Sequence, residues 1–405
     1  MFRGLDTSIA LAWLQRAYNA DVVAFCANLG QVDDLSHVEA RARKNGASAV
    51  YMDDLREEFI REYAFRSLRA GALYEGRYHM AASLGRPLIA KRLVEIAHME
   101  GADAIAHGAT GKGNDQVRFF SSVMALDPTL RVIAPVMEWD LTTRSKQIGY
   151  AAQYGIEIPA FKSSPYSRDS NLWGTSVECG ELDDIGKLPP RDAYTLTADP
   201  DEAPHEAVDI AIDFAGGVPV RLDGAALSAA ELVAALNRIG GAHGIGRLDI
   251  IENRLVGFKV RGVYESPAAE ILSQAMRELE NLVLDRDLLH MKTGLSQHYA
   301  ELIYDGKWFS GRREALDAFF ESYAHKVTGT IKLRLNRGRV TIVSRSAPEA
   351  LYNLEISSYE SDVGFDQTAG VGFSYIWSMQ GRVAALQKAA KAPEPVAEPS
   401  RQMAV

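Results

Sequence analysis

This chain of 405 residues is poor in cysteine and has no excess of positive charge. Its 2 cysteines, Cys26 and Cys179, provide neither a disulfide framework nor a metal cluster, which indicates a reducing compartment. Its 44 lysines and arginines are outnumbered by 53 aspartates and glutamates, giving a formal net charge of −9. Because proteins that coat nucleic acid need a basic surface, this class is excluded, whereas a local nucleotide site is not.

Several other signatures are absent. No run of about 18 apolar residues predicts a membrane span. Residues 1–8 lack the apolar stretch and the small-residue cleavage site of a signal peptide. The 9 histidines show no HExxH spacing and no GxSxG segment is present, so neither a zinc site nor a serine hydrolase is indicated. With 47% hydrophobic and 24% charged residues, the composition is typical of a globular protein, and we expect a cytoplasmic one.

Helical and strand patterns alternate over residues 1–165. Asp6-Thr7-Ser8 has side-chain oxygens that can cap the start of a helix. Strands separated by helices predict an α/β domain whose parallel sheet is covered on both faces. The predicted strands span 22–25, 47–52, 104–106 and 132–134, and the predicted helices span 33–44, 55–69, 87–100 and 142–154.

The pattern changes near residue 166, where an α+β domain is predicted up to residue 360. Two hairpins are expected, the first around Ala215-Gly216-Gly217 and the second around residues 336–339. A polar loop is expected to contain Ser167, Asp169, Asn171 and Ser176. A C-terminal helix over 361–388 and a disordered tail over 389–405 complete the chain. The predicted strands of this part span 208–214, 218–222, 248–251, 255–260, 328–335 and 340–346, and its helices span 228–238, 267–284, 285–304 and 313–324.

Residues 106–118 are the most informative stretch for function, because they follow a predicted strand at the edge where open parallel sheets bind ligands. Three glycines in this stretch allow backbone N–H groups to approach an anion, and Lys112 and Arg118 supply positive charge. The stretch is not a P-loop, because Gly113 rather than serine or threonine follows the lysine. A glycine-rich surface turn is the alternative interpretation.

Two further groups are weaker signals when taken alone. The segment Gly4–Ser8 opens a helix whose N-terminus could receive a phosphate, although a simple N-cap is the favoured interpretation of this segment alone. Glu252 and Tyr264 lie near predicted strand ends, where such side chains are usually structural.

Taken together, seven segments in this order resemble the argininosuccinate synthase family, ligases of the N-type ATP pyrophosphatase superfamily. The similarity extends over about residues 4–380, and the stretch at 106–118 is its most specific part. The matching segments are Gly4–Ser8, Ala27–Gln31, Ala72–Tyr78, Arg86–Lys91, Ala106–Arg118, Glu252–Arg254 and Arg261–Glu265.

The resemblance implies an enzyme that joins citrulline and aspartate into argininosuccinate through an adenylated citrulline, releasing AMP and pyrophosphate. It implies a nucleotide-binding first domain, a synthetase and multimerisation domain after it, and a cytoplasmic homotetramer. No catalytic base and no protein ligand for a metal are implied, and Mg²⁺ is expected on the phosphates of ATP. The implied contacts are Gly4, Leu5, Asp6, Thr7, Ser8, Ala27 and Gly108 for ATP, Thr110, Asn114 and Asp115 for aspartate, and Tyr78, Ser83, Asn114, Arg118, Ser167, Ser176, Glu252 and Tyr264 for citrulline.

The sequence departs from the family pattern in two ways. Phe2 and Arg3 stand where the family has a serine and a glycine, and the apolar strand before this loop is missing, so we expect a sheet without its first strand and an incomplete ATP loop. This leaves a non-catalytic homologue, which binds amino acids or assembles with a paralogue, as an alternative. Ala82, Phe120 and Val260 replace a threonine, a glutamate and a serine, which leaves a ligase for another ureido or amino-acid substrate as a further alternative.

Overall fold

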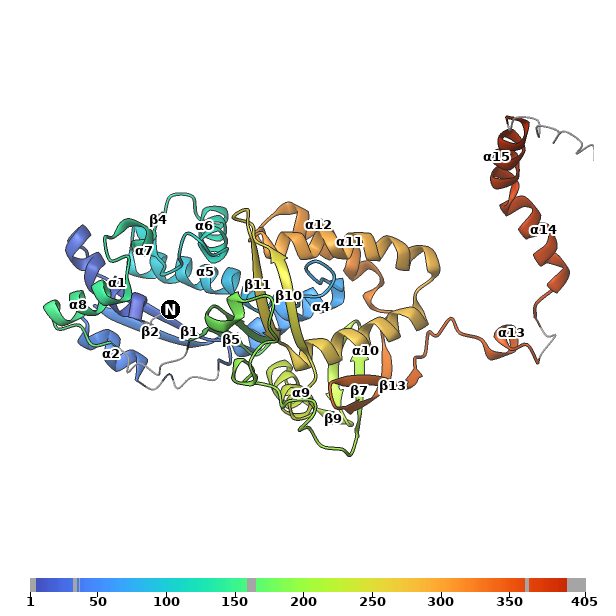
Figure 1. The fold of residues 1–405 in the computed structure, drawn as a ribbon, viewed down its shortest axis with the longest axis horizontal. Helices are drawn as coiled ribbons and strands as arrows, with labels where there is room; N and C mark the ends of the chain where they lie inside the picture. The colour runs from blue at the N-terminus through green and yellow to red at the C-terminus, as the bar shows by residue number, and fades with distance from the viewer. Residues whose placement is uncertain (1–4, 32–34, 36, 159–164, 361–363, 392–405) are drawn as a thin grey trace, which may run out of the picture. The chain divides into compact units, whose positions relative to one another are not determined.

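The computed structural model describes residues 5–31, 35, 37–158, 165–360 and 364–391. It contains two compact units, Met1–Leu351 and Tyr352–Val405. The first unit comprises an α/β part followed by an α+β part, in the predicted order (Figure 1).

The α/β part alternates helices and strands. Strand β1 pairs in parallel with β2, and β3 pairs in parallel with β4, which confirms the predicted parallel pairing. Among the described residues these are two separate two-stranded sheets. The elements are α1 (Leu5–Tyr18), β1 (Val23–Asn28), α2 (Val38–Lys44), β2 (Ala49–Asp54), α3 (Arg56–Glu58), a π-helical segment (Phe59–Ala64), α4 (Phe65–Ala70), α5 (Ala81–Glu100), β3 (Ala104–Ala106), α6 (Asp115–Leu126), β4 (Arg131–Ile133), α7 (Pro135–Glu138) and α8 (Arg144–Tyr154).

Helix boundaries in this part differ from the prediction at two places. The helix expected from residue 33 begins at Val38, and residues 32–34 and 36 lie outside the described residues. Helix α5 begins at Ala81 rather than at residue 87, so Pro87 lies inside the helix. A proline at this position removes one backbone hydrogen bond, but the residues around it are buried, and their packing keeps the helix intact.

The α+β part contains two antiparallel sheets with strand orders β10-β11-β6-β5 and β13-β12-β7-β8-β9. Both predicted hairpins are present, as β7 with β8 and β12 with β13. The elements are β5 (Ser167–Asn171), β6 (Gly174–Glu178), β7 (Val208–Ala215), β8 (Val218–Leu222), β9 (Ala225–Ala226), α9 (Ala229–Ala242), β10 (Arg247–Asn253), β11 (Lys259–Glu265), α10 (Pro267–Val283), α11 (Arg286–Tyr304), α12 (Gly311–Ala324), β12 (Gly329–Asn336) and β13 (Arg339–Ser346), with two short 3-10 helices at Gly180–Asp183 and Arg191–Ala193.

Two predictions for the α+β part were wrong. The polar segment interpreted as a loop is the hairpin β5–β6, which pairs with β11 through β6. The strand expected at 255–260 begins at Lys259, because residues 254–258 form the turn between β10 and β11. Gly257 adopts a φ of +96° in this turn, a conformation that glycine tolerates and other residues disfavour.

One hydrophobic core joins the α/β and α+β parts. Phe65 of α4 contacts Trp173 of the β5–β6 turn edge to face, with ring centroids 6.4 Å apart. Glu57 of α3 accepts a hydrogen bond of 2.9 Å from the backbone N–H of Ala230, at the start of α9. The same buried cluster includes Leu88 from α5 and Leu272 from α10. The two parts are therefore held in a fixed arrangement, which lets a site be built between them.

The second unit contains α13 (Leu354–Ser357), α14 (Gln367–Trp377) and α15 (Met379–Ala390), so the single C-terminal helix that was predicted is divided at Ser378. Its large apolar side chains are exposed, with Ile376 72% and Trp377 73% accessible. The predicted tail falls largely on residues 392–405, which lie outside the described residues.

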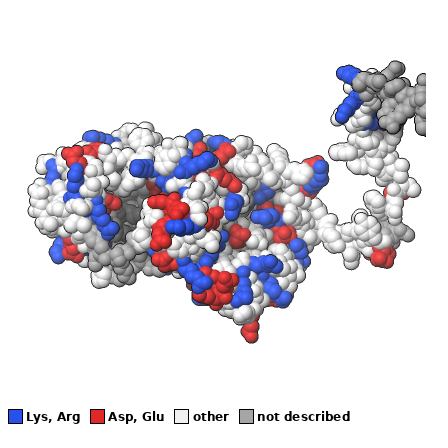
Figure 2. All heavy atoms as spheres, in the orientation of Figure 1, with Lys and Arg blue, Asp and Glu red and all other residues white. Residues whose placement is uncertain are grey.

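Positive and negative side chains are intermingled over the face of the molecule that Figure 2 shows. None of the described helices is both long and apolar enough to cross a membrane.

Candidate active site

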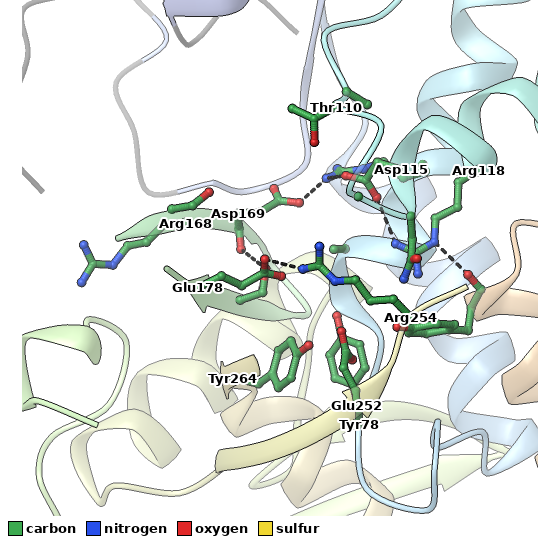
Figure 3. A pocket seen from close by; sticks show the side chains of 18 of the residues that line it. Tyr78, Thr110, Asp115, Arg118, Arg168, Asp169, Glu178, Glu252, Arg254 and Tyr264 are labelled. Atoms are coloured by element: carbon green, nitrogen blue, oxygen red, sulfur yellow. Dashed lines mark hydrogen bonds and ion pairs between the residues drawn. The ribbon is translucent and has the colours of Figure 1, made fainter. Parts of the chain in front are cut away.

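A cavity of about 680 Å³ lies between the two parts of the first unit. One side is the loop that follows β3 together with the start of α6, and the other is formed by strands β5, β6, β10 and β11 (Figure 3). This is the carboxyl end of a parallel strand, where the sequence predicted a ligand site.

The glycine-rich loop after β3 is held at both ends. The backbone N–H of His107 donates to the carbonyl oxygen of Ile133 at 3.1 Å, which continues the β3–β4 pairing. The loop ends at Asn114, which precedes α6. Gly108 lies against α1, since a Cβ atom at this position would lie 2.9 Å from the side chain of Thr7. Two residues predicted to contact ATP are therefore close together.

A network of alternating charges forms one part of the cavity, with two buried arginines and two partly exposed carboxylates (Figure 3). Arg86, 5% exposed, donates to Asp115 at 2.7 Å and to Asp169 of β5. Arg118 lies 3.0 Å from the other oxygen of Asp115 and donates through Nε to the carbonyl oxygen of Tyr304 at 2.9 Å. Burial alone would raise the pKa of the Asp115 carboxyl, but the two arginines hold it well below its usual range. Asp115 is therefore ionised at neutral pH.

A buried carboxylate and two tyrosines form the lower part of the cavity. Glu252, at the end of β10, is 3% exposed, and its Oε2 has no hydrogen-bond partner among the described residues. Burial raises the pKa of this carboxyl, and its hydrogen bond with Tyr264 opposes the shift. The rings of Tyr78 and Tyr264 stack with centroids 3.9 Å apart. A buried carboxylate oxygen without a partner suits the ammonium group of a ligand.

The structure brings nearly all the residues predicted for the two amino acids into this one cavity. Ser83 of α5 is the exception, because it is buried beside the cavity, where its Oγ has no partner among the described residues and Ala82 lines the wall. The residues brought together are Tyr78, Thr110, Asn114, Asp115, Arg118, Ser167, Ser176, Glu252 and Tyr264.

None of the residues predicted for ATP that the structure describes lines this cavity. Asp6 accepts a hydrogen bond of 2.6 Å from Gln147 of α8, and Ser8 is buried in α1. Ala27 lies in β1, and Leu5 is the first residue of α1. Gly4 lies outside the described residues.

Several cavity residues were not predicted as site residues. Arg86 and Arg254 lie in segments that matched the family, which was the available signal. Asp169 and Glu178 share a strand face with Ser167 and Ser176, but this two-residue spacing is informative only once the segment is known to form strands. Tyr304, the last residue of α11, had no sequence signal.

Arg254 connects the two sides of the cavity. Its guanidinium pairs with Glu178 of β6 and donates to the carbonyl oxygen of Lys112 at 3.1 Å. The following N–H, that of Leu255, donates to Oδ1 of Asn114 at 3.0 Å. The β10–β11 turn therefore holds the glycine-rich loop.

The described residues contain no group of three histidine, cysteine, aspartate or glutamate side chains that could hold a metal ion.

A parallel α/β part whose glycine-rich loop faces an α+β part across a cavity rich in charged side chains is an architecture that suits a two-domain synthetase. Comparison with known families agrees with this class. Residues 2–157 match the family model described as the arginosuccinate synthase N-terminal HUP domain, and residues 166–384 match that of the arginosuccinate synthase C-terminal domain. The chain belongs to the argininosuccinate synthase family.

Individual relatives agree over nearly the full length of both sequences. The argininosuccinate synthase of Rhodococcoides fascians is 50% identical over 377 residues, covering 93% of this chain and 95% of that protein. That of Pelodictyon phaeoclathratiforme is 47% identical and covers 93% of this chain and 94% of that protein. That of Pelotomaculum thermopropionicum is also 47% identical and covers 95% of this chain and 96% of that protein.

Family membership confirms the resemblance drawn from the seven segments. It also confirms the predicted function, that of the citrulline–aspartate ligase of arginine biosynthesis, with ATP as a substrate. The two alternatives, a non-catalytic homologue and a ligase for another amino acid, are not favoured.

Proposed function

We propose that the cavity between the α/β and α+β parts is where this chain joins citrulline to aspartate. The observation that carries this assignment is the meeting of nine predicted amino-acid contacts in one cavity. In this assignment Thr110, Asn114 and Asp115 hold aspartate, and Asn114 also contacts citrulline. The other citrulline contacts are Tyr78, Ser83, Arg118, Ser167, Ser176, Glu252 and Tyr264.

The charges of the cavity suit two α-amino acids. A carboxylate group needs a cation or N–H donors, and an ammonium group needs a carboxylate. Arg118 and the serine hydroxyls can bind a carboxylate group, while Glu252 and Asp115 can bind an ammonium group. Glu252 is the stronger candidate for citrulline, because its buried oxygen lacks a partner among the described residues.

The proposed reaction has two steps. The ureido oxygen of citrulline attacks the α-phosphorus of ATP, so a C–O–P linkage forms and pyrophosphate leaves. The amine of aspartate then attacks the ureido carbon, AMP leaves with the electron pair of the broken C–O bond, and the amine releases its proton to solvent. The chain contributes mainly by holding the reactants in line and by stabilising charge, since no side chain is assigned as a base.

ATP is proposed to bind at the start of α1, with contacts from Gly4, Leu5, Asp6, Thr7, Ser8, Ala27 and Gly108. The close approach of Gly108 to Thr7 supports this placement. Mg²⁺ would be held through the phosphates and water rather than by a cluster of protein carboxylates, and it would neutralise phosphate charge.

Three further features remain proposals. They are domain limits at 1–165, 166–360, 361–388 and 389–405, a cytoplasmic location and a homotetrameric assembly. The exposed apolar side chains of α14 and α15 support the assembly.

The purified full chain tests the proposed function directly. With ATP, citrulline and aspartate, it should release pyrophosphate and AMP in equal amounts, and omission of citrulline should abolish the release. Arg118→Gln should weaken the reaction strongly, whereas Arg238→Gln, an exposed arginine of α9, should not. Absence of citrulline-dependent pyrophosphate from the folded protein would overturn the proposal.

A further inference from the structure

A second cavity, of about 400 Å³, lies next to the proposed active site. Tyr78 and Tyr264 line both cavities, and their rings stack with centroids 3.9 Å apart. The tyrosine pair is therefore a wall that the two cavities share. None of the other residues assigned to ATP, citrulline or aspartate lines the second cavity.

Most of the charged side chains that line the second cavity are positive. Arg77 comes from the segment between α4 and α5, Arg247 from the start of β10, and Arg277 from α10. Glu270 of α10 is the one carboxylate among the described residues that line it. Three arginines thus face a single carboxylate.

Both carboxylate oxygens of Glu270 already have hydrogen-bond partners. His79 lies 3.0 Å from one carboxylate oxygen, and Gln274 donates to the other at 2.7 Å. The hydrogen bond with His79 is the largest influence on this carboxyl and lowers its pKa to about 2, against the effect of burial. Both oxygens of Glu270 therefore have partners other than the arginines, and Arg277 is only a smaller influence on the pKa of this carboxyl.

The three arginines differ in what holds them. Arg247 is fixed by Thr197, through the hydroxyl at 2.8 Å and the backbone carbonyl at 2.9 Å, and lies over the ring of Tyr194. Within the described part of the chain, Arg77 and Arg277 make no hydrogen bond and no ion pair of their own, although Arg277 lies near enough to Glu270 and Glu280 for its charge to lower the pKa values of both carboxyls. Two guanidinium groups are thus available to a ligand, while a third is held in place.

We propose that this second cavity binds a small oxyanion, and that its occupancy is transmitted to the citrulline site through the stacked Tyr78 and Tyr264 rings. Guanidinium groups present paired N–H donors that match the oxygens of a phosphate or a carboxylate. A volume of about 400 Å³ lies in the usual range for small-molecule sites. The shared chemistry is the oxyanion, and phosphate and dicarboxylate are its two possible sources.

Calorimetric titration of the full chain with inorganic phosphate, and separately with succinate, tests binding at constant ionic strength. We expect one of the two to bind with a dissociation constant on the order of 1 mM or tighter. The one that binds identifies the source of the oxyanion. If neither binds at about ten times this concentration, the proposal is overturned.

Three variants locate the binding. Arg277→Gln should weaken it by about fivefold or more, because a charged hydrogen-bond donor is lost. Arg118→Gln alters the first cavity and should leave binding unchanged. Arg238→Gln, an exposed helical arginine outside both cavities, is the matched control. Equal weakening by the control, or loss only in the Arg118 variant, would overturn the second site.

Coupling is tested by measuring citrulline binding with and without the anion. We expect the anion to change the citrulline dissociation constant about twofold or more in the wild type, because two coupled sites alter each other's affinity by the same factor. We expect no such change in Arg277→Gln, because this variant binds the anion weakly. This arm rests on the proposed function, whereas the anion titration does not. If the anion binds while citrulline binding is unaffected, the transmission through the tyrosines is overturned. If citrulline itself fails to bind, only the proposed function is contradicted.

Discussion

Arg254 donates a hydrogen bond of 3.1 Å to the backbone carbonyl oxygen of Lys112, and so joins the β10–β11 turn to the glycine-rich loop. The same guanidinium pairs with Glu178 of β6. With a side chain only 11% exposed, Arg254 makes these contacts largely away from water. The loop that carries Thr110 and Asn114 is thus positioned by a residue of the α+β part.

We predict that Arg254→Gln raises the KM values for aspartate and citrulline by about tenfold to a hundredfold, the effect of losing a hydrogen bond from a charged group. The kcat value should fall less, because Arg254 positions the loop and is not assigned a contact with substrate. Arg254→Lys should restore part of the loss, since lysine can keep one partner but not both. Steady-state kinetics with each substrate varied in turn measures this.

Arg221→Gln in β8 is the control for Arg254, because it removes an exposed arginine far from the loop in sequence. A fall in kcat with unchanged KM values in the Arg254 variants would contradict a positioning role.

Much of the fold could be predicted because short buried strands alternate with helices that have regular apolar spacing. The β7–β8 hairpin was recognisable from Gly216 and Gly217, which adopt φ values of +58° and +72° in the turn. Hairpin β5–β6 could not be recognised, because its residues are mainly polar and it is stabilised by pairing with β11, a contact between distant segments. Helix α5 was placed too late, because Pro87 was taken as its start.

The site was predictable where chemistry is concentrated in the sequence, as in residues 106–118. The sequence also marked Arg118, Glu252 and Tyr264 through the family resemblance. It did not reveal that Arg86 connects Asp115 to Asp169, because that network depends on how α5, α6 and β5 pack together. Arg86 lies in a segment that resembles the family, but the partners of its side chain could not be predicted from the sequence.

We predict that citrulline binding weakens as the pH falls, at a higher pH than an ordinary glutamate would cause. Burial raises the pKa of Glu252, so this carboxylate takes up its proton earlier and loses its attraction for the ammonium group of citrulline. Calorimetry of citrulline binding over a range of about pH 5 to pH 8 measures the effect.

Glu252→Gln should bind citrulline weakly and with little pH dependence over this range. Asp115 should not contribute to the change, because Arg86 and Arg118 keep its pKa low. A pH dependence that persists in Glu252→Gln would contradict the assignment.

The stability of the ligand-free protein should depend on pH in the opposite direction. Because the pKa of Glu252 is raised in the folded state, its protonation stabilises the folded state as the pH falls.

We predict that Lys292→Met destabilises the protein by about 3–5 kcal/mol, because it leaves the charge of Glu280 buried and unpaired. The two side chains lie 2.9 Å apart and are 8% and 6% exposed. The double variant Lys292→Met with Glu280→Leu should recover most of the lost stability, since a buried pair can be replaced by apolar groups at little cost. Urea unfolding at neutral pH measures both.

An exposed ion pair provides the comparison for Lys292 and Glu280. Arg334 and Asp209 pair with side chains 53% and 50% exposed, so Arg334→Met should change the free energy of unfolding little. If the double variant is no more stable than Lys292→Met alone, the buried pair is not the cause of the loss.

We predict that the exposed apolar face of α14 mediates assembly between copies of the chain. Phe373 and Trp377 stack with centroids 5.6 Å apart and are 64% and 73% exposed, and exposed apolar surface of this kind favours association. Sedimentation velocity should show the full chain as an oligomer, and Phe373→Ser with Trp377→Ser should shift it to smaller species. Gln387→Glu, a polar change on α15, should leave the assembly unchanged. An assembly that the double serine variant leaves intact would show that other surfaces hold it together.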